Sequence, residues 1–211
     1  MSEPYWKNTL LDRRTLLLEG TLTEKGVAKL IDNLYQLASL ESTEPITLFI
    51  SSNGGSVSPG LALFDALRQV QEGGTKVEGH VLDECMSMAL TVLLACDHRT
   101  AFPNSQFLYH SVCLDSLPGF VVGEIERNLD SYHERLKRHI DDVIQSQKRM
   151  MLMESARCGQ TVETLESLCR YGDEQLTIFS DQALQHGFIH DIVSHHPKLL
   201  PKMSPPPANP A

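Results

Sequence analysis

Short apolar runs alternate with helical repeats along the first half of the chain. The runs TLLLEG (15–20), ITLFIS (46–51) and KVEGHVL (76–82) predict strands. The second run is apolar on both faces, which is typical of a parallel strand covered on two sides. Between these runs, residues 23–41 and 59–74 carry apolar residues at helical spacing. This alternation predicts a right-handed α/β crossover fold.

The alternation of predicted strands and helices continues toward the C-terminus. Residues 85–97 predict an apolar helix, and residues 100–112 (TAFPNSQFLYHSV) predict short extended pieces around a Pro-Asn turn. Residues 180–193 predict a helix followed by a strand. We therefore expect a short N-terminal segment (1–9), one folded domain (10–196) and a proline-rich, disordered tail (197–211).

A long, charged helix is predicted over residues 119–157. Its apolar residues form only a thin stripe: Ile125, Leu129, Leu136, Ile140, Val143, Ile144 and Met151. Such a stripe fits a helix that leaves the globule and packs against a partner. A solvated surface helix supported by pairs of opposite charges would show the same pattern. The residues alone leave both interpretations open.

Composition narrows the class of protein. A chain of 211 residues can bury a full core, and its net charge of −9 argues against nucleic acid as the main ligand. No apolar run approaches the ~20 residues that cross a bilayer, and the N-terminus lacks a signal-like core. The five cysteines are too widely spaced for metal ribbons or redox motifs. We therefore expect a cytoplasmic protein with reduced thiols and no membrane partner.

The glycine-rich turn SSNGGSVSPG (51–60) is the first candidate for a functional site. It lacks the lysine of a phosphate loop and is not a G-x-S-x-G elbow. A strand, turn and helix in this order would expose backbone N–H groups, which suit an anion such as the oxyanion of acyl transfer. The alternative is a plain strand-to-helix turn in which glycine supplies the geometry and Ser56 or Ser58 caps the helix.

Two further residues carry candidate chemistry. Ser87 opens the apolar segment MSMALTVLLAC just after a predicted strand, and His110 ends the extended run SQFLYH. Taken singly, Ser87 is more simply a cap or a packed hydroxyl, and His110 a structural histidine. The spacing His186-x-x-x-His190 would suit a metal only on a helix, which Gly187 disfavours, so we expect no metal site.

In combination, the segments SSNGGSVSPGLALFDALR, MSMA and PNSQFLYHS resemble the ClpP serine peptidases. In that family a strand leads into a Gly-Gly turn, the nucleophile opens a helix, and a Pro-Asn-Ser segment leads to the histidine. RRTLLLEG and ALQHGFIHDIV extend the resemblance over residues 10–193. It implies an α/β fold of the ClpP/crotonase type, a ββα-type superhelix of repeated strand–helix units with a protruding handle helix at 119–157.

The resemblance implies a role for each matching residue. Ser87 would attack the peptide carbonyl, and His110 would act as general base and then as general acid. The N–H groups of Gly55 and Met88 would form the oxyanion hole.

The third member of the triad depends on the alignment. An ungapped match through QALQHG places Gln175 where the family carries an aspartate, and Asp173 lies two residues earlier. Extra residues before this segment make a two-residue shift reasonable, so we select Asp173, with Glu174 and Asp181 as rivals.

The implied function is that of a serine endopeptidase subunit that cleaves polypeptides by Ser-His-Asp acyl transfer, without a cofactor. Val57 and Cys113 would lie beside a substrate held as an added strand. The subunits would form heptameric rings, single or stacked in pairs through the handle. The segment before the first strand is shorter than the family's pore loops, which leaves a ring ATPase partner open.

Two other functions compete with this one. A catalytically silent subunit could share the fold and modulate an active paralogue. A crotonase-type enzyme could use the oxyanion hole on a thioester, but it would not require the pair of Ser87 and His110.

Overall fold

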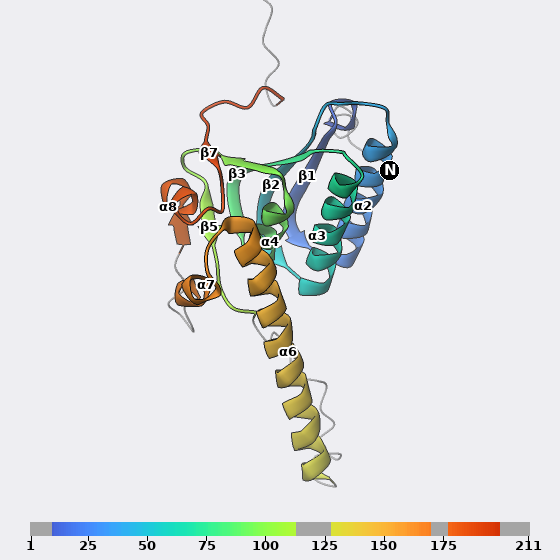
Figure 1. The fold of residues 1–211 in the computed structure, drawn as a ribbon. Coiled ribbons are helices and arrows are strands. Elements are labelled where there is room, and N and C mark those ends of the chain that lie inside the picture. The colour runs from blue at the N-terminus through green and yellow to red at the C-terminus, as the bar shows by residue number, and fades with distance from the viewer. Residues whose placement is uncertain (1–9, 113–127, 170–176, 199–211) are drawn as a thin grey trace, which may run out of the picture. The chain divides into compact units, whose positions relative to one another are not determined.

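The computed structural model describes residues 10–112, 128–169 and 177–198 (Figure 1). The chain divides into two compact units, Met1–Phe107 with Ile178–Ala211 and Leu108–Thr177. The predicted N-terminal segment, most of the tail and residues 119–127 of the predicted long helix lie outside the described residues.

The first unit is built on a parallel sheet. Its main path follows the order β1 (Thr15–Leu22), β2 (Ile46–Gly55), β3 (Val77–Met86), β4 (His98–Ala101) and β7 (Asp191–Ile192), and every neighbouring pair runs parallel. Off this path, the short strand β5 (Gln106–Leu108) pairs with β3 and with β6 (Thr177–Phe179). The predicted parallel α/β arrangement is confirmed.

Three helices of the first unit lie side by side on one face of this sheet: α2 (Glu24–Ser39), α3 (Val57–Glu72) and α4 (Met88–Ala95) (Figure 1). Gly79 of β3 allows α4 to approach closely, since a Cβ atom there would lie 2.7 Å from Leu93 and 2.9 Å from the Sγ atom of Cys96. The short helix α8 (Ser180–Gln185) precedes β7. Burial on both faces explains why Ile46–Ile50 reads as a continuous apolar run.

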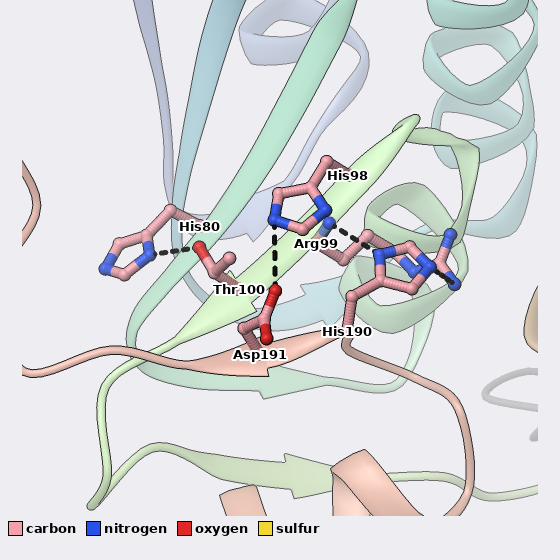
Figure 2. A network of polar contacts seen from close by, with 6 residues as sticks. All are labelled: His80, His98, Arg99, Thr100, His190 and Asp191. Carbon is pink, nitrogen blue, oxygen red and sulfur yellow. Dashed lines mark hydrogen bonds and ion pairs between the residues drawn. The ribbon is translucent and has the colours of Figure 1, made fainter.

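A buried arginine ties the last strand to the sheet. Arg99 of β4 donates from its side chain to the carbonyl oxygens of Cys96, Gly187 and Phe188, at 3.2, 3.1 and 2.9 Å. The backbone N–H of Arg99 donates to Nδ1 of His190 (Figure 2). The N–H of His190 in turn donates to the Arg99 carbonyl. These bonds hold the chain beside β4 as it enters β7.

His80 is a buried titratable residue of β3, the strand that pairs with β4. Its side chain is 1% exposed, and its Nδ1 lies 2.7 Å from the Thr100 hydroxyl (Figure 2). Its buried Nε2 has no hydrogen-bond partner among the residues that the structure describes. The rings of Phe49, Phe102 and His196 surround it. Burial, and secondarily the nearby His196, lower the pKa of His80 from 6.5 to about 4.

We expect His80 to make the fold acid-sensitive. Between pH 6.5 and 4 the unfolded state binds more protons at this residue than the folded state, so stability falls as the pH falls. At ~1.4 kcal/mol per pKa unit, the loss approaches about 3 kcal/mol at the acid end. Urea denaturation at a series of pH values should show a shallower pH slope for His80→Leu. His133→Gln, at an exposed position outside the sheet, serves as the control. An unchanged slope in His80→Leu would contradict the assignment.

Within residues 128–169, the second unit contains one long helix and one short one. Helix α6 (Leu129–Cys158) begins at the N-cap Asn128, whose side chain accepts from the Ser131 N–H, and it ends at Gly159 with φ +75°. Helix α7 (Val162–Leu168) follows directly. The helical prediction is confirmed over residues 129–157. Along α6, Leu129, Ile140, Ile144 and Leu152 are exposed apolar residues.

None of the helices within residues 10–112, 128–169 and 177–198 combines the length and apolar character needed to cross a bilayer. The same ranges hold no group of three or more His, Cys, Asp or Glu side chains that could ligate a metal ion. Cys85, Cys96, Cys158 and Cys169 are buried, reduced thiols.

Candidate active site

Ser87 occupies a sharp corner between a strand and a helix. The strand β3 runs on to Met86, beyond the predicted end at residue 82, and α4 begins at Met88. Ser87 therefore stands alone between them, with φ +53° and ψ −127°. A positive φ is unusual for a residue with a Cβ atom and persists only where the surroundings enforce it. Strain of this kind is concentrated at functional sites.

The Ser87 hydroxyl is not used as a helix cap. The side chain makes no capping hydrogen bond, although the Ser87 carbonyl accepts from the Leu90 N–H at 2.9 Å. The residue is half-buried, whereas all eight residues of α4 are buried. Neither structural explanation of Ser87, a capping side chain or a packed core hydroxyl, therefore describes it.

The glycine-rich turn touches this corner through Gly54. Gly54 has φ +89°, and a Cβ atom there would lie 2.6 Å from the Met86 carbonyl oxygen, 2.8 Å from the Ser87 Cβ atom and 3.1 Å from the Met88 nitrogen. The Gly54 N–H donates to the Ser52 hydroxyl at 3.2 Å, and that hydroxyl donates to the Gly20 carbonyl at 2.5 Å. The turn is thus held in place from β1 while its backbone lies against Ser87.

Gly55, the residue predicted to supply an oxyanion donor, faces the other neighbour of β2. With φ +143°, it would bring a Cβ atom within 2.6 Å of the Leu22 carbonyl oxygen in β1. Sequence reasoning placed the weight on Gly55 and missed Gly54. The two consecutive glycines were the available signal, but which of them approaches Ser87 depends on the packing of β2 against β3.

The remaining predicted residues of the first unit lie at the start of their helices. Val57 is the half-buried first residue of α3, and Met88 is the buried first residue of α4. Gly60 of α3 makes room for the Met88 side chain, because a Cβ atom there would lie 2.8 Å from the Met88 Cε atom. Ser56 is the N-cap of α3, as its position suggested, but its side chain makes no capping hydrogen bond.

His110 belongs to the second unit, four residues after the start of β5. It is half-buried, between Tyr109, whose hydroxyl donates to Glu154, and Ser111. The pairing of His110 with Ser87 stays a prediction. Cys113, Asp173, Glu174 and Gln175 lie outside the described residues, and Asp181 is an exposed residue in the first turn of α8.

Comparison with known proteins identifies the family. The family described as Clp protease matches residues 4–196. The chain belongs to the Clp protease family. It is 26% identical, over 184 residues, to the ATP-dependent Clp protease proteolytic subunit 1 of Chlamydia muridarum and to that of Chlamydia caviae, and 24% identical to that of Chlamydia trachomatis. Each alignment covers 87% of this chain and 88% of the relative.

Membership in the Clp protease family confirms the resemblance drawn from the three motifs. The parallel sheet and its flanking helices fit a fold of this family. The relatives compared above are proteolytic subunits by name.

We expect Gly54→Ala to damage the Ser87 corner selectively. The added methyl group would collide with the Met86 carbonyl and the Ser87 Cβ atom, which are backbone-linked and cannot move aside cheaply. Labelling of Ser87 by a fluorophosphonate should fall at least about tenfold, because a small displacement of a reacting atom costs rate steeply.

Gly74→Ala is the matched control for this substitution. Gly74 has a similar φ of +94°, but no atom of the described part of the chain lies within 4 Å of the added methyl group. Both variants pay for the positive φ, so their melting temperatures should fall, whereas only Gly54→Ala should lose Ser87 labelling. Equal labelling of the two variants would show that the contact between Gly54 and Ser87 is unimportant for reactivity.

Proposed function

We propose that this chain is a serine-type endopeptidase subunit that cleaves polypeptides by acyl transfer from Ser87. The observation that carries the proposal is the half-buried, uncapped Ser87 held at φ +53° against the glycine turn. A hydroxyl is a weak nucleophile by itself and needs a general base. The base in this proposal is His110, which the family motif PNSQFLYHS supplies.

The reaction would proceed in two halves. His110 takes the proton of Ser87 as its oxygen attacks the scissile carbonyl, and it returns that proton to the leaving amine. Water then hydrolyses the acyl-enzyme by the same route. The N–H groups of Gly55 and Met88 are the proposed donors to the tetrahedral oxyanion. The start of α4 at Met88 supports this role, since the first N–H groups of a helix have no partner within it.

The substrate and the acid complete the proposed site. A polypeptide would bind as an added strand beside Val57 and Cys113, which requires an extended and therefore unfolded segment. Asp173 remains the proposed acid that orients His110, with Gln175 as the first rival. If Gln175 held this place, a neutral hydrogen bond could orient the imidazole but would stabilise the imidazolium less well.

The proposed assembly is a heptameric ring, single or stacked in pairs, with α6 as the handle. In the described part of α6, the exposed residues Leu129, Ile140, Ile144 and Leu152 support a contact with another subunit. A ring ATPase partner fits the name of the relatives, which are ATP-dependent proteases. The buried reduced cysteines fit the expected cytoplasmic location.

We expect a fluorophosphonate to label the assembled wild-type protein at Ser87. Ser87→Ala should abolish labelling, and His110→Ala should slow it by about 100-fold or more, because general-base catalysis contributes on this scale. Ser56→Ala is the matched control: Ser56 is an exposed serine beside the same turn, without a capping bond. Labelling that persists in Ser87→Ala would contradict the proposed nucleophile.

The same assay separates the remaining candidates. Asp173→Asn should reduce labelling and peptidase activity, whereas Gln175→Ala should not; the reverse result would move the acid to Gln175. A wild-type protein that assembles and is never labelled would support the silent subunit instead.

We expect native mass spectrometry to show rings of the wild-type protein. Ile140→Glu combined with Ile144→Glu places two charges on the exposed apolar stripe of α6 and should convert stacked rings to single rings or subunits. Gln145→Glu, at the exposed polar position that follows Ile144, should leave assembly unchanged. A wild-type protein that remains monomeric at micromolar concentration would exclude the proposed role of α6.

A further inference from the structure

A buried carboxylate in the second unit accepts a hydrogen bond from the residue that precedes the candidate base. Glu154 of α6 is 2% exposed, and the Tyr109 hydroxyl donates to its Oε2 atom at 2.7 Å. A carboxylate in such a position is costly unless it is hydrogen-bonded. Tyr109 directly precedes His110, and neither Tyr109 nor Glu154 has a place in the reaction described above.

The segment that carries His110 is anchored on both sides of this residue. Before it, Tyr109 is bound to Glu154. After it, the Val112 N–H donates to the side-chain oxygen of Gln147 at 2.6 Å. Gln147 and Glu154 are separated by about two helical turns and therefore lie on the same face of α6. One helix thus holds the segment around His110 at two points, Tyr109 and Val112.

The Tyr109 hydroxyl stays protonated. Burial, followed by the charge and hydrogen bond of Glu154, raises the pKa of Tyr109 far above its ordinary value. The hydroxyl therefore remains a donor throughout the working range of pH. A charge-assisted hydrogen bond of this kind is shorter and stronger than a neutral one.

We propose that Tyr109 and Glu154 form a positioning pair that fixes the direction and reach of the His110 imidazole. The proposal rests on the proposed function, in which His110 is the general base. The pair touches no reacting atom and acts only through His110. Its expected effect is on kcat rather than on KM, because it aligns the base without binding the substrate.

The test uses the assembled full-length protein and three variants. Tyr109→Phe removes the hydroxyl, and Glu154→Gln keeps an acceptor for it. The double variant Tyr109→Phe with Glu154→Met removes both polar groups of this hydrogen bond, so neither of these two side chains is left as a buried group without the other, and the fold should recover stability relative to Tyr109→Phe. Tyr35→Phe is the control, since it removes an exposed tyrosine–glutamine hydrogen bond with Gln69 in the first unit.

For peptide hydrolysis we expect Tyr109→Phe to lower kcat by about tenfold with KM unchanged within about twofold. Glu154→Gln should lose much less, because the hydrogen bond survives. The double variant should melt close to the wild-type temperature yet keep the low kcat. Wild-type kcat in the double variant would show that the pair serves stability alone and would overturn the proposal.

A second measurement does not depend on catalysis. Carbethoxylation of His110 by diethylpyrocarbonate, followed by peptide mass spectrometry across pH, reports the accessibility and pKa of its imidazole. We expect Tyr109→Phe and the double variant to change the rate at least about threefold, and Tyr35→Phe to leave it unchanged. If the wild-type protein proves inactive, this readout still tests the pair while the proposed function fails. An unchanged His110 rate in Tyr109→Phe would overturn the positioning role even in an active enzyme.

Discussion

The approach of the β2 backbone to the corner after β3 is the constraint on which the candidate site depends. The two strands pair in regular register up to Ile50 and Val81, but the next pair is Ser52 with Cys85. A step of two residues along β2 is therefore matched by a step of four along β3, and after this register shift Met86 and Ser87 lie against Gly54. Only a residue without a Cβ atom fits at that point. The unusual φ of Ser87 is enforced by this packing, together with the start of the fully buried helix α4 directly after it.

Much of this fold could be predicted because the spacing of apolar residues within a strand or helix depends only on which of its faces are buried. Burial on both faces produces the run Ile46–Ile50, and one buried face produces the spacing of Val27, Leu34 and Leu37 in α2. The end of β3 was misplaced for an equally local reason: Asp83 and Glu84 interrupt the apolar run, although their backbone continues the strand. That error started the predicted helix at residue 85, three residues before the observed start of α4 at Met88. The position of Gly54 against Ser87 comes from the register change between β2 and β3, which no local pattern records.

Polar contacts between residues that are distant in the sequence could not be predicted either. Arg99 reads as a surface residue, yet it is 3% exposed and satisfies the carbonyl oxygens of Gly187 and Phe188. Its bonds replace a longer strand pairing, since β7 contributes only Asp191 and Ile192 to the ladder with β4. Glu154 is a similar case, because it continues the charged pattern of α6 but is buried with Tyr109. A charged residue whose partner is distant in sequence has no local signal that separates it from a solvated one.

The division of the chain into two units bears on the proposed chemistry. Ser87 belongs to the unit of the parallel sheet and His110 to the unit of α6, so the proposed reaction requires that each be held rigidly within its own unit. Ser87 is held by backbone packing against Gly54, which acts at van der Waals distance and needs no charge. His110 follows a tyrosine that is held by a hydrogen bond to a buried carboxylate on a helix. That helix also carries the exposed apolar residues assigned to the subunit contact. In the proposed enzyme, a neighbouring subunit that steadies α6 would therefore steady the general base as well, which links assembly to activity through a single helix.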